Sequence, residues 1–366
     1  MFKLLQGNVS DVIKTVPDNS IHCVVTSPPY FGLRDYGTAT WIGGDSACNH
    51  NNDKKHLAGK LDKNYVPGNS GNGIYKTVCK KCGAIRVDEQ IGIEETPEQY
   101  IDNLCAVFDE IYRVLNSMGT VWLNLGDTYF SSSLNKHKTL KPKDLIGIPW
   151  RVALALQERG WFLRQDIIWH KPNAMPSPSL DRCVTAHEYV FLLSKSGSYF
   201  FNADNIKEPY TKPMNRWGGD VLKADGIGSD WDVATGQTTY RNRNMRPDPN
   251  GKNCRSVWSI NTKPFKDAHF AVMPEELADR CVKASVSSGC CSVCYMPVNK
   301  EGLKTCACDS DIIPCRVLDP FSGAGTTGVV ALKHGHNFIG IELNKDYVTI
   351  ANRRLLALEE SANTLF

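Results

Sequence analysis

The feature that most constrains the fold is a glycine-rich turn near the C-terminal end of the chain. Residues 316–319, Arg-Val-Leu-Asp, are predicted to form a short strand, residues 326–334 have a helical pattern, and residues 337–342 are predicted to form the next strand. The turn after the first strand is Gly323-x-Gly325-x-x-Gly328, in which the glycines let the backbone approach a ligand closely. This succession predicts a βαβ unit with two parallel strands.

The place of this unit in the chain predicts how the whole sheet is ordered. Only 24 of the 366 residues follow Glu342, too few for the strands that would complete a dinucleotide-binding domain. We therefore expect the other strands to come from upstream, beginning with the buried-strand pattern at residues 21–26. The predicted fold class is α/β, with a permuted Rossmann-like, mostly parallel sheet and helices on both faces. Further strands are expected at 119–125, 162–169 and 188–194, and helices at 100–115 and 149–159.

Three segments interrupt this alternation. Residues 40–92 are rich in Gly, Asn and Lys, residues 205–257 are polar and basic, and residues 288–314 are dense in cysteine. We interpret them as insertions into one domain formed by residues 1–204 and 258–366. No apolar run is long enough for a signal peptide or a membrane span, so we expect a cytoplasmic protein without membrane contact.

Clustered cysteines predict zinc, because cytosolic thiols are kept reduced and rarely form disulfide frameworks. The first group pairs Cys48-x-His50 with Cys79-x-x-Cys82, and the second pairs Cys291-x-x-Cys294 with Cys306-x-Cys308. We expect up to two structural zinc ions, with Cys290 and Cys315 as substitutes in the second group. The alternative is a set of unligated thiols on flexible insertions. The remaining scattered cysteines are expected to pack in the core: Cys23, Cys105, Cys183 and Cys281.

The glycine-rich turn by itself predicts an adenosine cofactor without naming it. Glu342, at the end of the following strand, can accept hydrogen bonds from ribose hydroxyls. The same glycine spacing occurs in NAD-binding proteins, so both NAD and S-adenosylmethionine fit this motif. A tight turn without a ligand is the third alternative.

A second motif, Thr26-Ser27-Pro28-Pro29-Tyr30, follows the strand at residues 21–26. Exocyclic amines of nucleobases are poor nucleophiles because the nitrogen lone pair is conjugated into the ring. A serine hydroxyl and the carbonyl of the next proline can accept hydrogen bonds from such an amine and favour a more tetrahedral nitrogen. The prolines stiffen the loop, and Tyr30 can stack on a base extruded from a duplex. Alone, however, Pro-Pro-Tyr after a strand is usually only a turn.

Together the two motifs resemble those of bacterial and phage DNA amino-methyltransferases. The matching strings are Val25-Thr26-Ser27-Pro28-Pro29-Tyr30 and Asp319-Pro320-Phe321-Ser322-Gly323-Ala324-Gly325-Thr326-Thr327, and residues 169–173, Arg182 and 187–189 also look like family segments. The order, catalytic loop before cofactor motif, is similar to the β subgroup. The resemblance implies a methyltransferase sheet and direct methyl transfer from S-adenosylmethionine to an exocyclic amine of a flipped base in double-stranded DNA.

The resemblance also implies the site residues. The catalytic residues would be Ser27, Pro28, Pro29 and Tyr30, and residues 269–274 are similar to the segment that contacts the methionine end of the cofactor. Asn8 stands where many members carry Asp, so its role stays open. The implied cofactor-binding residues are Asn8, Thr26, Phe270, Pro274, Asp319, Pro320, Phe321, Ser322, Gly323, Gly325, Thr326, Thr327 and Glu342.

Ser27 in the first loop position resembles the N4-cytosine signature, with N6-adenine as the alternative. Cys315 follows a proline, as a C5-cytosine nucleophile would, but it precedes the cofactor strand, so we interpret it as structural or metal-linked. Three other classes stay open: a non-catalytic zinc-dependent DNA-binding protein, an NAD-dependent oxidoreductase, and a methyltransferase of protein or RNA. A restriction partner and a homodimer are also left open.

Contacts with DNA are expected from residues 205–257, which lie where β-subgroup enzymes carry target recognition. Basic and amide side chains there suit phosphate contacts and base-edge readout, although a solvated polar loop would have the same composition. The net charge of +3 does not decide this, because a basic face can be hidden by acids elsewhere. The expected DNA-binding residues are Lys171, Arg241, Arg243, Arg246 and Arg255.

Overall fold

The computed structural model describes residues 1–32, 36, 38–50, 78–130, 137–209, 250–263 and 272–363. Internal contacts divide the chain into a larger unit, residues 1–201 with 256–366, and a smaller unit, residues 202–255. In the smaller unit, the described part holds the 3-10 helix η2 (Ala203–Ile206) and an antiparallel bridge between Glu208 and Lys252. Most of the expected target-recognition segment, 205–257, lies outside the described residues.

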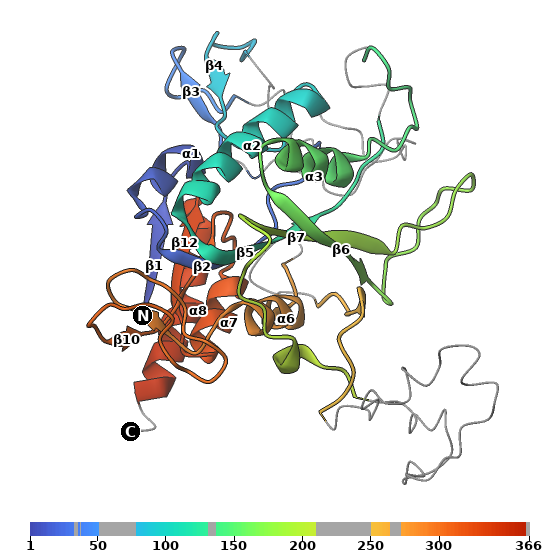
Figure 1. The fold of residues 1–366 in the computed structure, drawn as a ribbon. Coiled ribbons are helices and arrows are strands. Elements are labelled where there is room, and N and C mark those ends of the chain that lie inside the picture. Colours follow the sequence, from blue (N-terminus) through green and yellow to red (C-terminus); the bar gives the residue numbers. More distant parts are fainter. Residues whose placement is uncertain are drawn as a thin grey trace, which may run out of the picture. The chain divides into compact units, whose positions relative to one another are not determined.

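The larger unit is built on an eight-stranded sheet with the order β1-β12-β11-β2-β5-β7-β6-β8. The pairs are parallel except at β7, which runs antiparallel to both β5 and β6. Strand β2 pairs directly with β11, so the strand before Ser27 lies beside the strand before the glycine-rich turn (Figure 1). This pairing confirms the permuted order. The strands are β1 (Phe2–Gln6), β2 (Ile21–Thr26), β5 (Leu115–Leu125), β6 (Phe162–His170), β7 (His187–Ser194), β8 (Val257–Ser259), β11 (Arg316–Asp319) and β12 (Asn337–Glu342).

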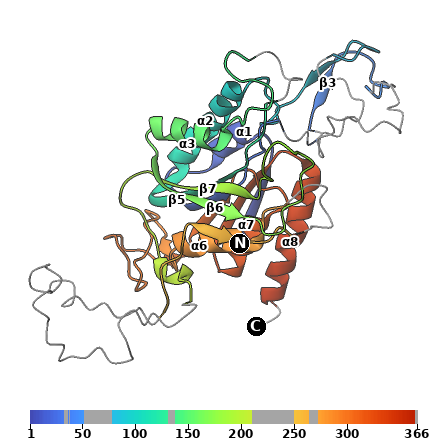
Figure 2. The ribbon, with the colours of Figure 1, turned by 90° about the vertical axis from the view of Figure 1, so that its right-hand side faces the viewer.

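Helices cover both faces of the sheet, as predicted (Figure 2). On one face lie α1 (Val9–Val12), which continues into the 3-10 helix η1 (Ile13–Thr15), α2 (Pro97–Val114) and α3 (Ile148–Glu158). On the other lie α6 (Glu275–Ser285), α7 (Thr326–Lys333) and α8 (Lys345–Asn363). Helix α2 begins three residues before the predicted start, because the Thr96 hydroxyl accepts a hydrogen bond from the Gln99 N–H and Pro97 fits the first turn.

The core explains why these elements pack closely. All six residues of β2 are buried, and apolar side chains at helical spacing on α2 fill the space above it: Tyr100, Leu104, Phe108 and Ile111. On the other face, a Cβ at Gly328 would lie 2.5 Å from the Phe338 ring. The third glycine of the turn motif therefore lets α7 pack directly on β12. None of the helices in the described ranges is long and apolar enough to cross a membrane.

Two small hairpins stand apart from the main sheet. Strands β3 (Thr40–Ile42) and β4 (Ile85–Val87) pair antiparallel within the first insertion. Strands β9 (Cys290–Cys291) and β10 (Ile312–Ile313) do the same within the third. Both hairpins carry or adjoin predicted metal ligands.

Candidate active site and metal centres

The two sequence motifs meet at the edge of the sheet where β2 and β11 end. The Thr26 hydroxyl donates a 2.7 Å hydrogen bond to Asp319 Oδ1, and both side chains are buried. This bond joins residues 293 positions apart in the chain. The loop at residues 27–30 and the glycine-rich turn are therefore two walls of one pocket.

Asp319 and Glu342 hold the glycine-rich turn in shape. Asp319 also accepts hydrogen bonds from the Thr327 hydroxyl at 2.9 Å and from the Phe321 N–H at 3.1 Å. Glu342 accepts the N–H groups of Gly323 and Asn344, each at 2.8 Å and each through a different carboxylate oxygen. Gly323 has a φ of 49°, in the left-handed region that favours glycine. Each Glu342 oxygen keeps a further lone pair for a ligand hydroxyl.

Burial raises the pKa of Asp319 from its ordinary value of 3.8 to about 6, although its hydrogen bonds oppose the shift. Its folded-state pKa lies above the unfolded value, so the folded state binds more protons in that interval. The contribution of Asp319 to stability therefore falls as pH rises from about 4 to about 6, by roughly 3 kcal/mol in total. Urea unfolding of Asp319→Asn across this range should show a flatter pH dependence than the wild type. If the unfolding free energy depended on pH equally in both proteins, the raised pKa of Asp319 would be contradicted.

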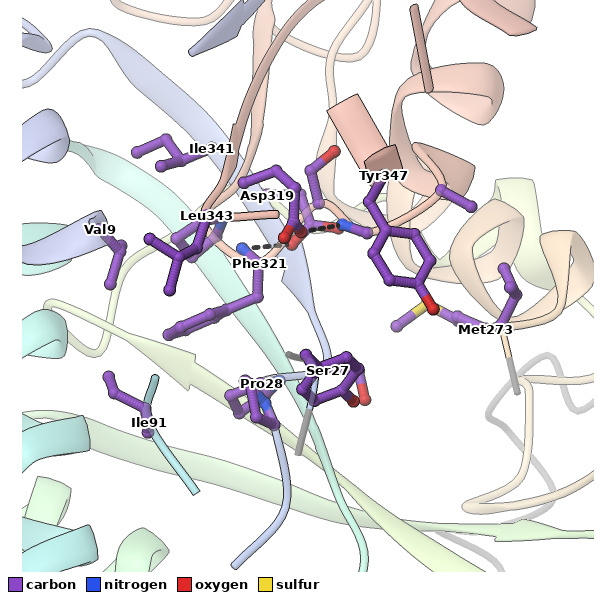
Figure 3. A pocket seen from close by; sticks show the side chains of 18 of the residues that line it. Val9, Ser27, Pro28, Ile91, Met273, Asp319, Phe321, Ile341, Leu343 and Tyr347 are labelled. Carbon is purple, nitrogen blue, oxygen red and sulfur yellow. Dashed lines mark hydrogen bonds between the residues drawn. The ribbon is translucent and has the colours of Figure 1, made fainter. Parts of the chain in front are cut away.

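One hydroxyl of the turn is buried against the sheet, because a Cβ at Gly340 would lie 2.7 Å from Ser322 Oγ. Ser322 Oγ is buried and has no hydrogen-bond partner in the part of the chain that the structure describes. The turn forms one wall of a pocket that is lined by Phe321, Leu343 and Tyr347 (Figure 3). Apolar and aromatic walls suit an adenine ring, whereas the Glu342 carboxylate suits polar groups. The residues present therefore fit an adenosine cofactor.

On the opposite wall of the pocket, hydrogen bonds fix the loop at residues 27–30. Ser27 Oγ lies 3.2 Å from the Tyr30 hydroxyl, which donates at 2.7 Å to Glu188 and lies 3.0 Å from Asn124 Oδ1. Tyr100 donates a 2.9 Å hydrogen bond to the Pro29 carbonyl. Within the described residues, by contrast, no protein donor is paired with the carbonyl of Pro28. Ser27 and Pro28 both line the pocket.

Tyr30 is anchored at both its ring and its hydroxyl. A Cβ at Gly126 would lie 2.6 Å from the ring, so the ring packs on glycine backbone. Burial first, and then the charge of Glu188, raise the pKa of Tyr30 well above its ordinary value, so the hydroxyl stays protonated. Lys171 is paired with the other oxygen of Glu188 and lies 4.3 Å from the Trp169 ring centroid. Lys171, which the sequence predicts to contact DNA, is one of the residues that line the pocket.

Most predicted site residues line this one pocket, and the exceptions have clear places. Thr26 is buried and does not line the pocket. Gly325 caps α7 with a φ of 76°. Pro274 caps α6 next to the lining residues Val272 and Met273. In the smaller unit, Arg255 forms an ion pair with Glu208. Four predicted residues lie outside the described residues: Phe270, Arg241, Arg243 and Arg246. The predicted residues that line the pocket are Asn8, Ser27, Pro28, Pro29, Tyr30, Lys171, Asp319, Pro320, Phe321, Ser322, Gly323, Thr326, Thr327 and Glu342.

Sequence reasoning missed several residues of the pocket. Glu188 and Asn124 follow from strand order, because β7 begins and β5 ends at the catalytic edge. Glu89 and Gln90 come from the first insertion. Asn8 caps α1 by accepting a hydrogen bond from the Ser10 N–H, and its side chain donates to Glu89 at 3.3 Å. Asn8, which stands where many family members carry Asp, is therefore part of the pocket wall.

The first metal group is assembled as predicted. The ligand atoms of Cys48, His50, Cys79 and Cys82 all lie within 4.8 Å of one another. The Cys48 and Cys79 sulfurs are 3.8 Å apart, close to the separation of about 3.8 Å that two thiolates have around tetrahedral zinc. A Cβ at Gly44 would lie 2.8 Å from the Cys82 sulfur, so only glycine leaves room there.

The second group lies beside the hairpin β9–β10. The sulfurs of Cys291, Cys294, Cys306 and Cys308 lie within 4.8 Å of one another, again a tetrahedral set. The backbone N–H groups of Val293 and Cys294 each donate to the Cys291 sulfur at 3.4 Å, which favours a thiolate.

The two substitute cysteines form a separate group. Cys290 and Cys315 are buried beside His22, not within the Cys291 group. His22 Nδ1 accepts the Arg316 N–H at 3.0 Å, and Nε2 donates to the Tyr295 carbonyl at 2.8 Å. Both ring nitrogens are thus committed to backbone, which leaves no lone pair for a metal. The expectation that Cys183 packs in the core is wrong, because it is exposed on the β6–β7 loop.

Comparisons with known proteins give the family of the chain. A family model described as DNA methylase matches residues 21–353. The Type II methyltransferase M.XycI of Xanthomonas campestris pv. cyanopsidis is 35% identical, over 96% of this chain and 87% of that protein. M.Cfr9I of Citrobacter freundii is 34% identical over the same shares. The solved structure of the PvuII cytosine-N4-specific DNA methyltransferase is 16% identical, with a TM-score of 0.49, and covers 99% of this chain and 91% of its own. The predicted family is confirmed: the chain belongs to the DNA methylase family.

Proposed function

We propose that the protein transfers a methyl group from S-adenosylmethionine to the N4 amine of a cytosine flipped out of double-stranded DNA. The observation that carries the proposal is the buried hydrogen bond between Thr26 and Asp319, which holds the catalytic loop against the cofactor turn. The residues that would hold the cofactor are Phe321, Ser322, Gly323, Glu342 and Tyr347. The cofactor supplies an electrophilic methyl group on a sulfonium.

The chain's own residues prepare the amine. The Ser27 hydroxyl and the Pro28 carbonyl accept its two hydrogens and reduce conjugation of the nitrogen lone pair with the ring. After transfer, the methylated nitrogen carries one proton too many. That proton passes to Ser27, the Ser27 proton to Tyr30, and the Tyr30 proton to Glu188, along contacts of 3.2 Å and 2.7 Å. Glu188 ends protonated and returns the proton to solvent.

The choice of cytosine rests on Ser27 and Lys171. On its Watson–Crick edge, cytosine carries two acceptors beside its amine, the ring nitrogen N3 and the exocyclic oxygen O2, whereas adenine has N1 followed by the C2–H. Lys171 has three N–H donors and shares one with Glu188, so others remain for both acceptors. Adenine N6 remains the alternative target.

Methyl incorporation from labelled cofactor into duplex DNA, RNA and total protein tests the substrate class. We expect label in duplex DNA alone. Label in RNA or protein instead would overturn the proposal. A parallel titration with NAD should give no binding, and binding of NAD instead of S-adenosylmethionine would favour an oxidoreductase.

We also propose that each tetrahedral group holds a structural zinc ion. The geometry of both groups supports this, and few large apolar side chains lie near them to stabilise the insertions otherwise. The first site lies on the segment that leads through β4 to Gln90 in the pocket wall. There the Gln90 side chain accepts a hydrogen bond from the Tyr36 N–H at 2.7 Å. The second lies at the other end of the strands, near His22 and Arg316.

Cys79→Ser and Cys306→Ser should therefore have different effects. Each should lower the zinc content, measured by plasma emission spectroscopy, from two ions per chain to one. Cys79→Ser should in addition weaken S-adenosylmethionine binding by about tenfold, the cost of roughly one wall hydrogen bond. Cys306→Ser, the matched control, should leave cofactor affinity within about twofold. Two zinc ions retained in both variants would contradict the assignment.

A further inference from the structure

The loop between β6 and β7, residues 171–186, leaves the sheet at the catalytic edge (Figure 1). Lys171 and Glu188, at its two ends, both line the pocket. The Lys171 N–H donates to the Ala186 carbonyl at 2.8 Å, which closes the base of the loop. The two ends of the loop are therefore held at the pocket.

The loop is stiff at its base and along its length. Asn173 donates to the Thr262 carbonyl at 2.9 Å and accepts the Thr262 N–H at 3.0 Å. Three prolines, Pro172, Pro176 and Pro178, restrict the backbone between the base and the tip. The loop can thus present a side chain at a fixed place without packing against the core.

The side chains that the tip presents are apolar. Leu180 is completely exposed, at 101%, the highest value among the large apolar side chains of the described ranges, and Met175 is 83% exposed. Removing such apolar side chains from water is favourable. Two of them on a stiff loop whose ends line the pocket therefore indicate a binding partner.

Cationic side chains adjoin the tip, and one of them is paired with an acid of the loop. Lys138, Lys141 and Lys143 are exposed on the neighbouring segment, residues 137–145. Lys143 pairs with Asp181 at 2.7 Å, which ties that segment to the loop. Arg182 lies 3.6 Å from the centroid of the Tyr129 ring. An apolar tip flanked by cations fits the base stack and phosphates of duplex DNA, not an apolar protein surface.

We propose that the loop 171–186 is a wedge that enters the DNA duplex, with Leu180 filling the space that the target base leaves. The inference rests on the proposed function, in which a base must leave the duplex to reach Ser27. Unstacking a base costs free energy, and an apolar side chain in the vacated space offsets part of that cost. Leu180 is a positioning residue, because it acts on the duplex and not on the reacting atoms.

The test compares Leu180→Ala with Leu180→Met and with the control Leu154→Ala, an exposed leucine on α3. The recognition sequence is first read by sequencing the methylated DNA of cells that express the chain. Methylation is then measured on two duplexes, one fully paired and one with a mismatch at the target base, which lowers the cost of flipping. On the paired duplex, Leu180→Ala should lose about 10- to 100-fold in kcat/KM, whereas Leu180→Met and Leu154→Ala should lose less than about threefold.

The mismatched duplex distinguishes a wedge from a merely structural role of Leu180. There Leu180→Ala should recover to within about threefold of the wild type, with unchanged affinity for S-adenosylmethionine. An equal loss on both duplexes, or no loss on the paired one, would overturn the wedge while the wild type still methylates DNA. Failure of the wild type on both duplexes would instead overturn the proposed function.

Discussion

Replacing Ser27 with alanine should lower the methylation rate by about 10²- to 10³-fold and leave S-adenosylmethionine affinity within about twofold. The magnitude is that of removing one preorganised hydrogen-bonding group from a catalytic site. The Ser27 hydroxyl lies on the substrate wall, 3.2 Å from the Tyr30 hydroxyl, and makes no contact that shapes the cofactor turn. Single-turnover methylation of duplex DNA gives the rate, and calorimetric titration gives the affinity.

Ser322→Ala is the matched control, since it removes the same group from the other wall of the pocket. Ser322 lines the pocket on the side of the glycine-rich turn, and its buried hydroxyl has no partner within the described residues, so the variant alters the turn and not the wall that carries Ser27. This variant should weaken cofactor binding by about tenfold and change the rate at saturating cofactor by less than about threefold. If both serine variants reduced affinity and rate alike, the assignment of the two walls would be wrong.

Asp319→Ala should be the most damaging single change at the site. Removing the carboxylate leaves the Thr26 hydroxyl and the Phe321 N–H without their buried acceptor and separates the catalytic loop from the cofactor turn. Breaking such a buried network costs about 3–5 kcal/mol of folding free energy. We also expect cofactor affinity to fall by at least about 100-fold, the effect of two lost hydrogen bonds. Urea unfolding and calorimetric titration check the two effects.

The control for this change is Asp11→Ala, which removes an exposed carboxylate from a surface pair with Lys14. A surface pair of this kind contributes about 0–1 kcal/mol, so stability and affinity should hardly change. Thr26→Val adds a finer comparison, because it breaks the bond between the motifs and leaves the turn's own hydrogen bonds intact. Wild-type cofactor affinity in Asp319→Ala would show that Asp319 does not organise the turn.

Much of the fold could be predicted because its signals are local. The turn at Gly323 and Gly325, the acidic end of β12 and the buried run of β2 each lie within a few residues. The permuted order followed from counting the residues after Glu342. The spacing within each pair of zinc ligands is local too, as in Cys48-x-His50 and Cys79-x-x-Cys82, and the structure brings these two pairs together.

The rest depended on long-range pairing that no local pattern encodes. Glu188 reaches the Tyr30 hydroxyl only because β7 pairs antiparallel with β5. The sequence favours Tyr30 as a stacking ring, but it does not reveal that the hydroxyl is fixed by Glu188. The exposure of Cys183 and Leu180 depends on how far the β6–β7 loop extends from the sheet, which a proline-rich stretch alone does not determine.

The central claim is that the loop at Ser27 and the turn at Gly323 form one site for methyl transfer to an exocyclic amine. The most direct measurement is mass spectrometry of nucleosides from DNA methylated by the purified protein, with Ser27→Ala as the parallel sample. The account predicts N4-methylcytosine from the wild type and at most a trace from the variant. N6-methyladenine would overturn the choice of base. DNA that carries 5-methylcytosine, or no methylated nucleoside, would contradict the claim itself.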